Sequence, residues 1–195
     1  TESNYADAYD HFEKSLAIFD SINYKSGVAN MCSNIGAIMF NTGDSARAIE
    51  YHLRSLKVSE EINDKLRIGT SLNNIGSTYK NNPATADKAL EYFLKALPIF
   101  EGINHTYGVG AVSGNIGEIY FDNKQYDKAL PYLVSCLNSF SGTVDAIFPL
   151  TMLGRVYAAQ EDFQKAHYYH INAIDFAWKL GAQLELTKSL LAFAE

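Results

Sequence analysis

The sequence predicts an all-α fold in which about five helix–turn–helix repeats stack into a solenoid. A glycine recurs in phase, with copies 40, 41 and 37 residues apart, at Gly36, Gly76, Gly117 and Gly154. An alanine series keeps step with it, at Ala8, Ala48, Ala89, Ala129 and Ala166. Periods in this range are typical of repeat architectures. The whole chain has only 4 prolines, and apolar residues recur at three- and four-residue steps, which is the helical period.

Residues 66–81 illustrate the helical pattern. Leu72, Ile75, Gly76 and Tyr79 fall on one face, and an almost uncharged polar face lies opposite. The same periodicity predicts ten helices, at 4–21, 26–41, 44–61, 66–81, 84–101, 106–122, 125–139, 145–159, 162–179 and 182–195.

Turn-forming residues separate these helices. The segment 41–45 offers Gly43 to end one helix and Asp44 or Ser45 to cap the next. The segment 81–85 repeats this with one extra residue, whereas the link at 137–146 is three residues shorter than its counterparts. We therefore expect the angle between the fourth and fifth pairs to differ locally.

The phased glycines lie in the middle of helices, where glycine costs about 1 kcal/mol relative to alanine. A cost repeated at one phase needs a packing reason, so we expect the partner helix to pass too close for a side chain. A second set of small residues marks the reciprocal contact, and larger residues fill the space one turn along. The small set is Ser15, Ser55, Ala96, Cys136 and Ala173, and the larger set is Met39, Tyr79, Tyr120 and Tyr157.

With Gly and Tyr one turn apart in the first helix and small–aromatic–small in the second, the chain resembles the tetratricopeptide repeat family. The resemblance covers residues 4–195, and the period near 40 residues is similar to that of long-repeat members in bacterial signalling proteins. It implies a right-handed α-α superhelix whose first helices line a concave groove. His52 and His170 depart from the pattern, because the family prefers an aromatic residue there.

The resemblance implies that an extended peptide or partner segment binds in this groove. Asn34, Asn74 and Asn115 form a ladder with one rung per repeat, and an asparagine amide matches the C=O and N–H of a peptide. The alternative is that these asparagines bond to adjacent helices or only solvate the groove. The candidate peptide-binding residues are Asn30, Asn34, Asn73, Asn74, Asn115, Glu118, Phe148, Met152 and Arg155.

The predicted groove carries little charge. Glu118 and Arg155 are its main ionic residues, and the several Lys and Arg with which chaperone-adaptor members clamp a terminal carboxylate are absent. An acidic C-terminal tail is therefore not the expected ligand. Phe148 and Met152 either form a hydrophobic anchor site or pack under the shortened link.

The sequence offers no convincing set of residues for catalysis or for metal binding. His167 and His170 lie one turn apart, but no carboxylate or cysteine completes a metal site at a suitable spacing. Cys32 and Cys136 have no neighbouring base to make a thiolate nucleophile. The glycines do not form a phosphate-binding loop. We expect a protein that is not an enzyme and needs no cofactor or metal.

The net charge limits the classes of partner that the chain is expected to bind. The 195-residue chain has a net charge of −6, with 16 scattered Lys and Arg, which argues against nucleic acid. No apolar run approaches the roughly 20 residues that span a bilayer, so membrane insertion is not expected. Two distant cysteines fit a reducing, cytoplasmic setting.

We expect one solenoid domain over residues 1–195, as a fragment of a longer protein. Its repeats span approximately 1–25, 26–65, 66–105, 106–143 and 144–181, with a partial repeat at 182–195. The last helix has an apolar face without a partner, which further repeats, another domain or an end-to-end homodimer would cover. The leading functional hypothesis is a non-catalytic protein–protein interaction module or scaffold. The alternative is a regulatory or sensor segment of a larger signalling enzyme, such as a nucleotide cyclase or histidine kinase.

Overall fold

The computed structural model describes residues 2–194, with side chains from Tyr5 to Ala194. Within this range the chain is helical and contains no β-strand, which confirms the all-α fold class. The helices form two compact units that divide between His105 and Thr106, at a predicted repeat boundary.

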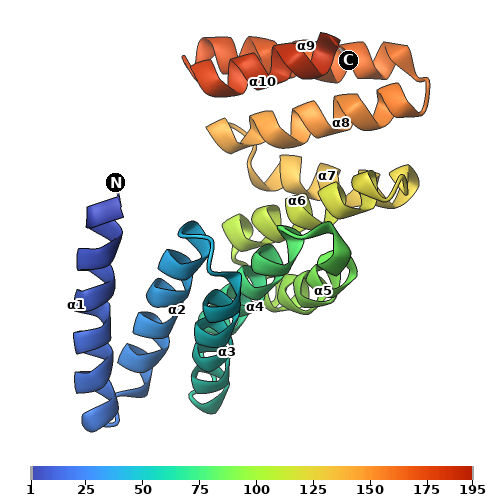
Figure 1. The fold of residues 1–195 in the computed structure, drawn as a ribbon. Helices are drawn as coiled ribbons and strands as arrows, with labels where there is room; N and C mark the ends of the chain where they lie inside the picture. Colours follow the sequence, from blue (N-terminus) through green and yellow to red (C-terminus); the bar gives the residue numbers. More distant parts are fainter. Residues whose placement is uncertain (1, 195) are drawn as a thin grey trace. The chain divides into compact units, whose positions relative to one another are not determined.

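The first unit is built from consecutive helix pairs (Figure 1). Helix α2 packs along α3 and α4 packs along α5, while α1 contacts α2 and α3 contacts α4. The bounds are α1 Glu2–Ser21, α2 Lys25–Asn41, α3 Ser45–Glu61, α4 Lys65–Lys80, the 3-10 turn η1 Pro83–Thr85 and α5 Ala86–Gly102.

The second unit repeats this arrangement. Helix α6 packs along α7 and α8 along α9, and α10 covers one side of α8 and α9 (Figure 1). The bounds are α6 Thr106–Asp122, α7 Tyr126–Ser139, the 3-10 turn η2 Val144–Ala146, α8 Ile147–Ala159, α9 Phe163–Lys179 and α10 Gln183–Ala194.

Every predicted helix is present, with ends within two residues of the prediction. The helices expected from 84 and 145 begin two residues later, because a 3-10 turn precedes each. At the first turn, the Asn82 side chain accepts a hydrogen bond from the Ala84 N–H at 3.0 Å. The Thr85 hydroxyl donates to the carbonyl of Tyr79 at 2.5 Å, which holds the chain in the tighter turn.

The phased glycines lie directly against side chains of the partner helix, as predicted. A Cβ built at Gly76 would lie 2.8 Å from Phe93 Cε1, and one at Gly36 would lie 2.6 Å from His52. Leu133 lies against Gly117 and His170 against Gly154 in the same way. Four of the five reciprocal small residues are buried, and Ser15 is half-buried, so this contact repeats from pair to pair.

The tyrosines one turn beyond three of these glycines stack on a tyrosine of the second helix. Ring centroids are 5.8, 5.7 and 5.5 Å apart in the pairs Tyr79–Tyr92, Tyr120–Tyr132 and Tyr157–Tyr169. Offset stacking of this kind adds about 0.5–1.5 kcal/mol beyond the burial of apolar area. The stacked pairs fill the larger space that the sequence pattern predicts.

All links between the helices except the one between α4 and α5 contain a residue in the left-handed region. Gly43 has φ of 84° and Asn63 has φ of 54°. Such a residue ends a helix and turns the chain, and asparagine adopts this conformation more readily than most residues. This explains why the link Ile62-Asn63-Asp64 needs no glycine.

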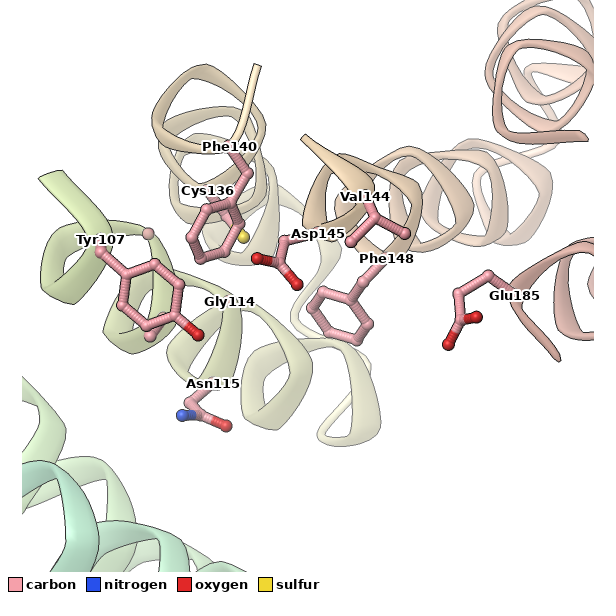
Figure 2. Close-up of a pocket in the computed structure, with 11 residues that line it drawn as sticks. Tyr107, Gly114, Asn115, Cys136, Phe140, Val144, Asp145, Phe148 and Glu185 are labelled. Carbon is pink, nitrogen blue, oxygen red and sulfur yellow. The ribbon is translucent and has the colours of Figure 1, made fainter. Parts of the chain in front are cut away.

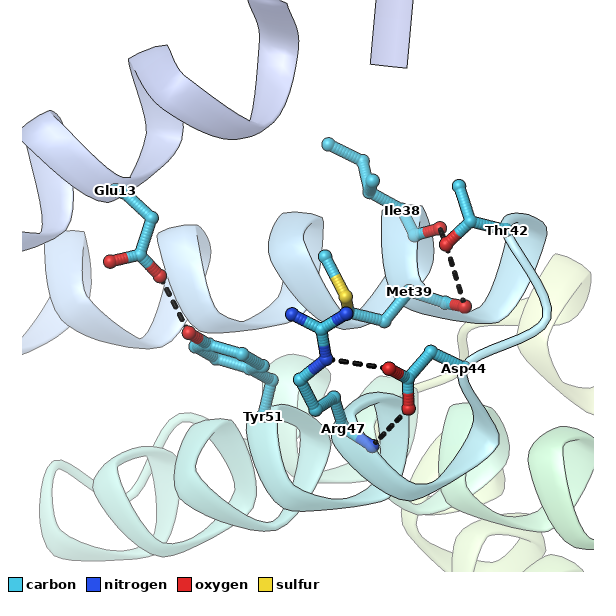
Figure 3. Close-up of polar contacts among 7 residues, drawn as sticks. All are labelled: Glu13, Ile38, Met39, Thr42, Asp44, Arg47 and Tyr51. Carbon is cyan, nitrogen blue, oxygen red and sulfur yellow. Dashed lines mark hydrogen bonds and ion pairs between the residues drawn. The ribbon is translucent and has the colours of Figure 1, made fainter. Parts of the chain in front are cut away.

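Aspartates then start the next helices. In Figure 3 the Asp44 carboxylate accepts hydrogen bonds from the backbone N–H of Arg47 at 3.0 Å and from its Nε at 2.6 Å. These two bonds lower the pKa of Asp44. Nearby, the hydroxyl of Tyr51 donates to Glu13 of α1 at 2.5 Å, which joins α1 to α3 (Figure 3).

The same cap at the start of α4 allows a test. Asp64 accepts from the Arg67 N–H at 3.1 Å and from its Nε at 2.7 Å. We expect Asp64→Ala to lower the free energy of unfolding by about 1 kcal/mol, because it leaves a helix-terminal N–H without its acceptor. Asp64→Asn keeps that acceptor and should lose less in urea unfolding. Equal losses in the two variants would show that the cap is not the cause.

Candidate functional site

The first unit presents a polar face along its first helices. We define the amide face as Asn30 and Asn34 of α2 together with Asn73 and Asn74 of α4, two helices that contact each other. Among the described residues, the side chains of Asn30 and Asn34 have no hydrogen-bond partner. Asn34 therefore makes no side-chain hydrogen bond to an adjacent helix within the described part of the chain.

On α4 the two asparagines interact within their own helix. The Asn73 Nδ2 donates to the Asn74 Oδ1 at 3.4 Å. The Oδ1 of Asn73 is buried and accepts no hydrogen bond from the described part of the chain. An unpaired buried acceptor is costly, so this oxygen is an unfavourable feature of the folded chain.

Two hollows open on the amide face. One, of about 240 Å³, lies between α2 and α4 and includes Asn30, Asn34 and the Asp64–Arg67 ion pair. The other, of about 200 Å³, includes Asn74 and has His52 in its lining. Burial lowers the pKa of His52 to about 4, so the imidazole is neutral at pH 7. The hollows present amides, hydroxyls and one internally neutralised ion pair.

The second unit contains a larger hollow of about 400 Å³ between α6, α7 and the start of α8 (Figure 2). We call it the aromatic hollow. Three rings line it, those of Tyr107, Phe140 and Phe148. Gly110, Gly114 and Cys136 also line it, and the polar groups are Asn115, Asp145 and Glu185.

The structure separates the two candidates for a hydrophobic anchor. Phe148 is 40% exposed and faces the aromatic hollow, together with Asn115. Met152 is 4% exposed and packs in the core with Leu153 and Val156, so its expected position on the binding surface is wrong. Met152 is buried although helical spacing aligns it with Asn115.

The remaining candidates of the second unit, Glu118 and Arg155, are half-buried. The guanidinium of Arg155 lies 4.9 Å from the ring centroid of Phe121. Glu118 and Arg155 also interact with neighbouring residues of the chain.

The cysteines are buried thiols. Burial raises the pKa of Cys32 to about 11 and that of Cys136 to about 12, the latter helped by the Asp145 carboxylate. A thiol with so high a pKa is a poor nucleophile at pH 7. Within residues 2–194, no group of three His, Cys, Asp or Glu could hold a metal ion.

The sequence reasoning missed Tyr107, Phe140, Asp145 and Glu185. It followed one face of the first helices, whereas the aromatic hollow also uses the end of α7, the link before α8, and α10.

Across the described residues, no helix has the length and apolarity to cross a bilayer.

A family model for the tetratricopeptide repeat matches residues 27–102 and 108–177, which together are more than half of the chain. No curated protein sequence matches the chain. Solved structures share its fold. BtubC (BKLC) from P. vanneervenii has a TM-score of 0.79 and 22% identity, covering 94% of this chain and 75% of BtubC.

Two further solved structures share the fold. A Rap protein complexed with Competence and Sporulation Factor has a TM-score of 0.80 and 17% identity, covering 96% of this chain and 53% of its own. The apo form of the quorum sensor NprR from B. thuringiensis has a TM-score of 0.77 and 16% identity, covering 97% and 54%. The chain thus spans about half the length of these two proteins.

Proposed function

Because the chain belongs to the tetratricopeptide repeat family, we propose that it binds an extended peptide or partner segment without catalysing a reaction. The first unit would bind it through the amide face, and the second through Asn115, Phe148 and the surface beside them. The observation that carries the proposal is the pair of Asn30 and Asn34 amides that bond to no described residue.

The chemistry of the amide face suits main-chain recognition. Each asparagine offers a donor and an acceptor side by side, which match the carbonyl and N–H of an extended peptide. The Asn73 oxygen adds a buried acceptor without a donor from the described residues. The hollows beside the asparagines would hold side chains of the ligand, so main chain and side chains are read by different groups.

The structural neighbours give this proposal its context. One is a Rap protein in complex with Competence and Sporulation Factor, and another is a quorum sensor. Identities of 16–17% establish a common fold, and we extend ligand binding to this chain only as part of the proposal. The raised pKa values of both thiols support a role that does not depend on a cysteine nucleophile.

The test compares partners captured from a lysate of the source cells. We expect proteins captured by the wild-type chain to be lost from an Asn34→Ala/Asn74→Ala variant, because it removes two amides of the amide face. Each lost hydrogen-bonding side chain should cost about 1 kcal/mol, so capture should weaken by roughly tenfold or more.

The matched control is Asn138→Ala/Asn172→Ala, which removes two amides from the second helices α7 and α9. Circular dichroism should show all three proteins equally folded. Partners retained by the wild type and this control but lost from the amide-face variant would support the proposal. The same partners on all three proteins would contradict it.

A further inference from the structure

We propose that the aromatic hollow binds a basic side chain, with arginine preferred to lysine, from the ligand. This rests on the proposed function and names the chemistry of one subsite. The aromatic walls, the carboxylates at the opening and a lining without Lys, Arg or His favour such a side chain.

The walls offer exposed aromatic faces. Tyr107 is 63% exposed, and its ring centroid lies 5.4 Å from that of Phe140 with an angle of 60° between the rings. Phe148 forms another wall and lies close to Gly114, where an added Cβ would be 3.2 Å from its Cε1. A side chain at Gly114 would therefore fill this space. Exposed rings around a hollow attract cations through their negative faces.

The polar groups of the hollow favour a positive charge. Asp145 and Glu185 contribute carboxylates, and no Lys, Arg or His is among the residues that line it. In Figure 2 the Asp145 carboxylate is seen between the rings of Tyr107 and Phe148. The net charge of −6 adds a longer-range attraction for basic ligands.

Asp145 differs from the aspartates that cap helices, because it lies inside the 3-10 turn η2. The three capping aspartates pair with a basic residue three positions later, in Asp44–Arg47, Asp64–Arg67 and Asp162–Lys165. Three positions after Asp145 the residue is Phe148, which lines the hollow.

Within the described chain, Asp145 makes no ion pair or hydrogen bond through its side chain. Glu185 meets only the Lys188 ammonium, at 3.6 Å. The hollow thus presents the Asp145 carboxylate without a cation from the described part of the chain. A cation from another molecule would pair with this carboxylate, and a guanidinium would also stack on the rings.

One of the two hollows of the first unit differs from the aromatic hollow in both its charge and its lining. It lies between α2 and α4, and its aspartate, Asp64, is bound by Arg67 at 2.7 Å. Its lining contains no aromatic residue. Cation binding is therefore expected at the aromatic hollow and not at its counterpart.

The probe is the blocked peptide Ac-Ala-Arg-Ala-NH2, followed by NMR through the amide signals of Gly110, Gly114 and Asn115. The matched peptide replaces arginine with citrulline, which keeps the shape and removes the charge. We expect saturable shifts with a Kd on the order of 1 mM for the arginine peptide. The citrulline peptide should bind about tenfold more weakly.

Variants of the full chain separate the contributions. Asp145→Asn should weaken arginine binding about tenfold, and Tyr107→Leu should weaken it severalfold. The control is Asp175→Asn on α9, which changes the net charge equally at an exposed pair with Lys179. It should bind like the wild type.

Equal binding of the citrulline peptide, or unchanged binding by Asp145→Asn, would overturn the basic subsite, as would the absence of saturable shifts. These results would not bear on the proposal for the amide face, because its test uses Asn34 and Asn74 in the first unit. The proposed function fails separately if the Asn34→Ala/Asn74→Ala variant keeps every partner.

Discussion

Gly76→Leu is expected to lower the free energy of unfolding by 3 kcal/mol or more, on the order of the largest losses seen for overpacked cores. Gly76 is buried in α4, and a Cβ there would lie 2.8 Å from Phe93 Cε1 and 2.9 Å from Cδ1. Phe93 is fully buried and has no open space into which to move. The helix-propensity gain of about 1 kcal/mol cannot offset this.

The matched control is Gly102→Leu at the end of α5. Nothing lies within 4 Å of a Cβ built at Gly102, and the residue is exposed. The same four carbon atoms are therefore added without a clash, and the midpoint of urea unfolding should change little. If Gly76→Leu unfolds at the wild-type midpoint, α4 and α5 do not approach as closely as the structure requires.

The fold could be predicted for the same physical reason that Gly76→Leu is expected to destabilise the chain. A helix–helix contact that admits only hydrogen at one position leaves a glycine in the sequence, and stacking of similar pairs repeats it. Gly36 and Gly76 face large side chains of the partner helix, His52 and Phe93. The positions of the glycines in the sequence therefore indicate where the two helices of each pair meet. Helix ends were equally readable, because residues such as Gly43 and Asp44 act locally.

The binding surface was less readable because it depends on elements that do not repeat. Asn34 and Asn74 follow the repeat, and each lines one of the two hollows of the amide face. Met152 occupies the corresponding phase, but it packs in the core with Leu153 and Val156, so periodicity alone gave the wrong side-chain environment. The aromatic hollow depends on Asp145 in a 3-10 turn and on Glu185 of α10, which no periodic pattern connects.

Acid should destabilise the chain through His52, and His52→Phe should remove that contribution. His52 is 1% exposed, its Nδ1 has no hydrogen-bond partner among the described residues, and burial lowers its pKa to about 4. In the unfolded chain the pKa of histidine is about 6.5. The unfolded state therefore binds the proton more tightly, and the stability present above pH 6.5 is lost as pH falls towards 4.

At pH 4.5 this loss amounts to about 2–3 kcal/mol relative to pH 7. Urea unfolding of the wild type and of His52→Phe at both pH values measures it, because losses from other groups are common to both proteins. Phenylalanine should fit, since Phe93 lies against Gly76 as His52 lies against Gly36. The variant should thus be less sensitive to acid by 2–3 kcal/mol, on the order of the wild-type loss at this site.

An exposed histidine provides the control. His11→Phe on α1 also replaces an imidazole with a phenyl ring, but at an exposed position. Its acid sensitivity should equal that of the wild type. If His52→Phe and the wild type lose equal stability between pH 7 and pH 4.5, the imidazole is not held neutral beneath Gly36. A smaller loss in His52→Phe alone would show that a histidine in an aromatic position of the repeat makes this unit sensitive to acid.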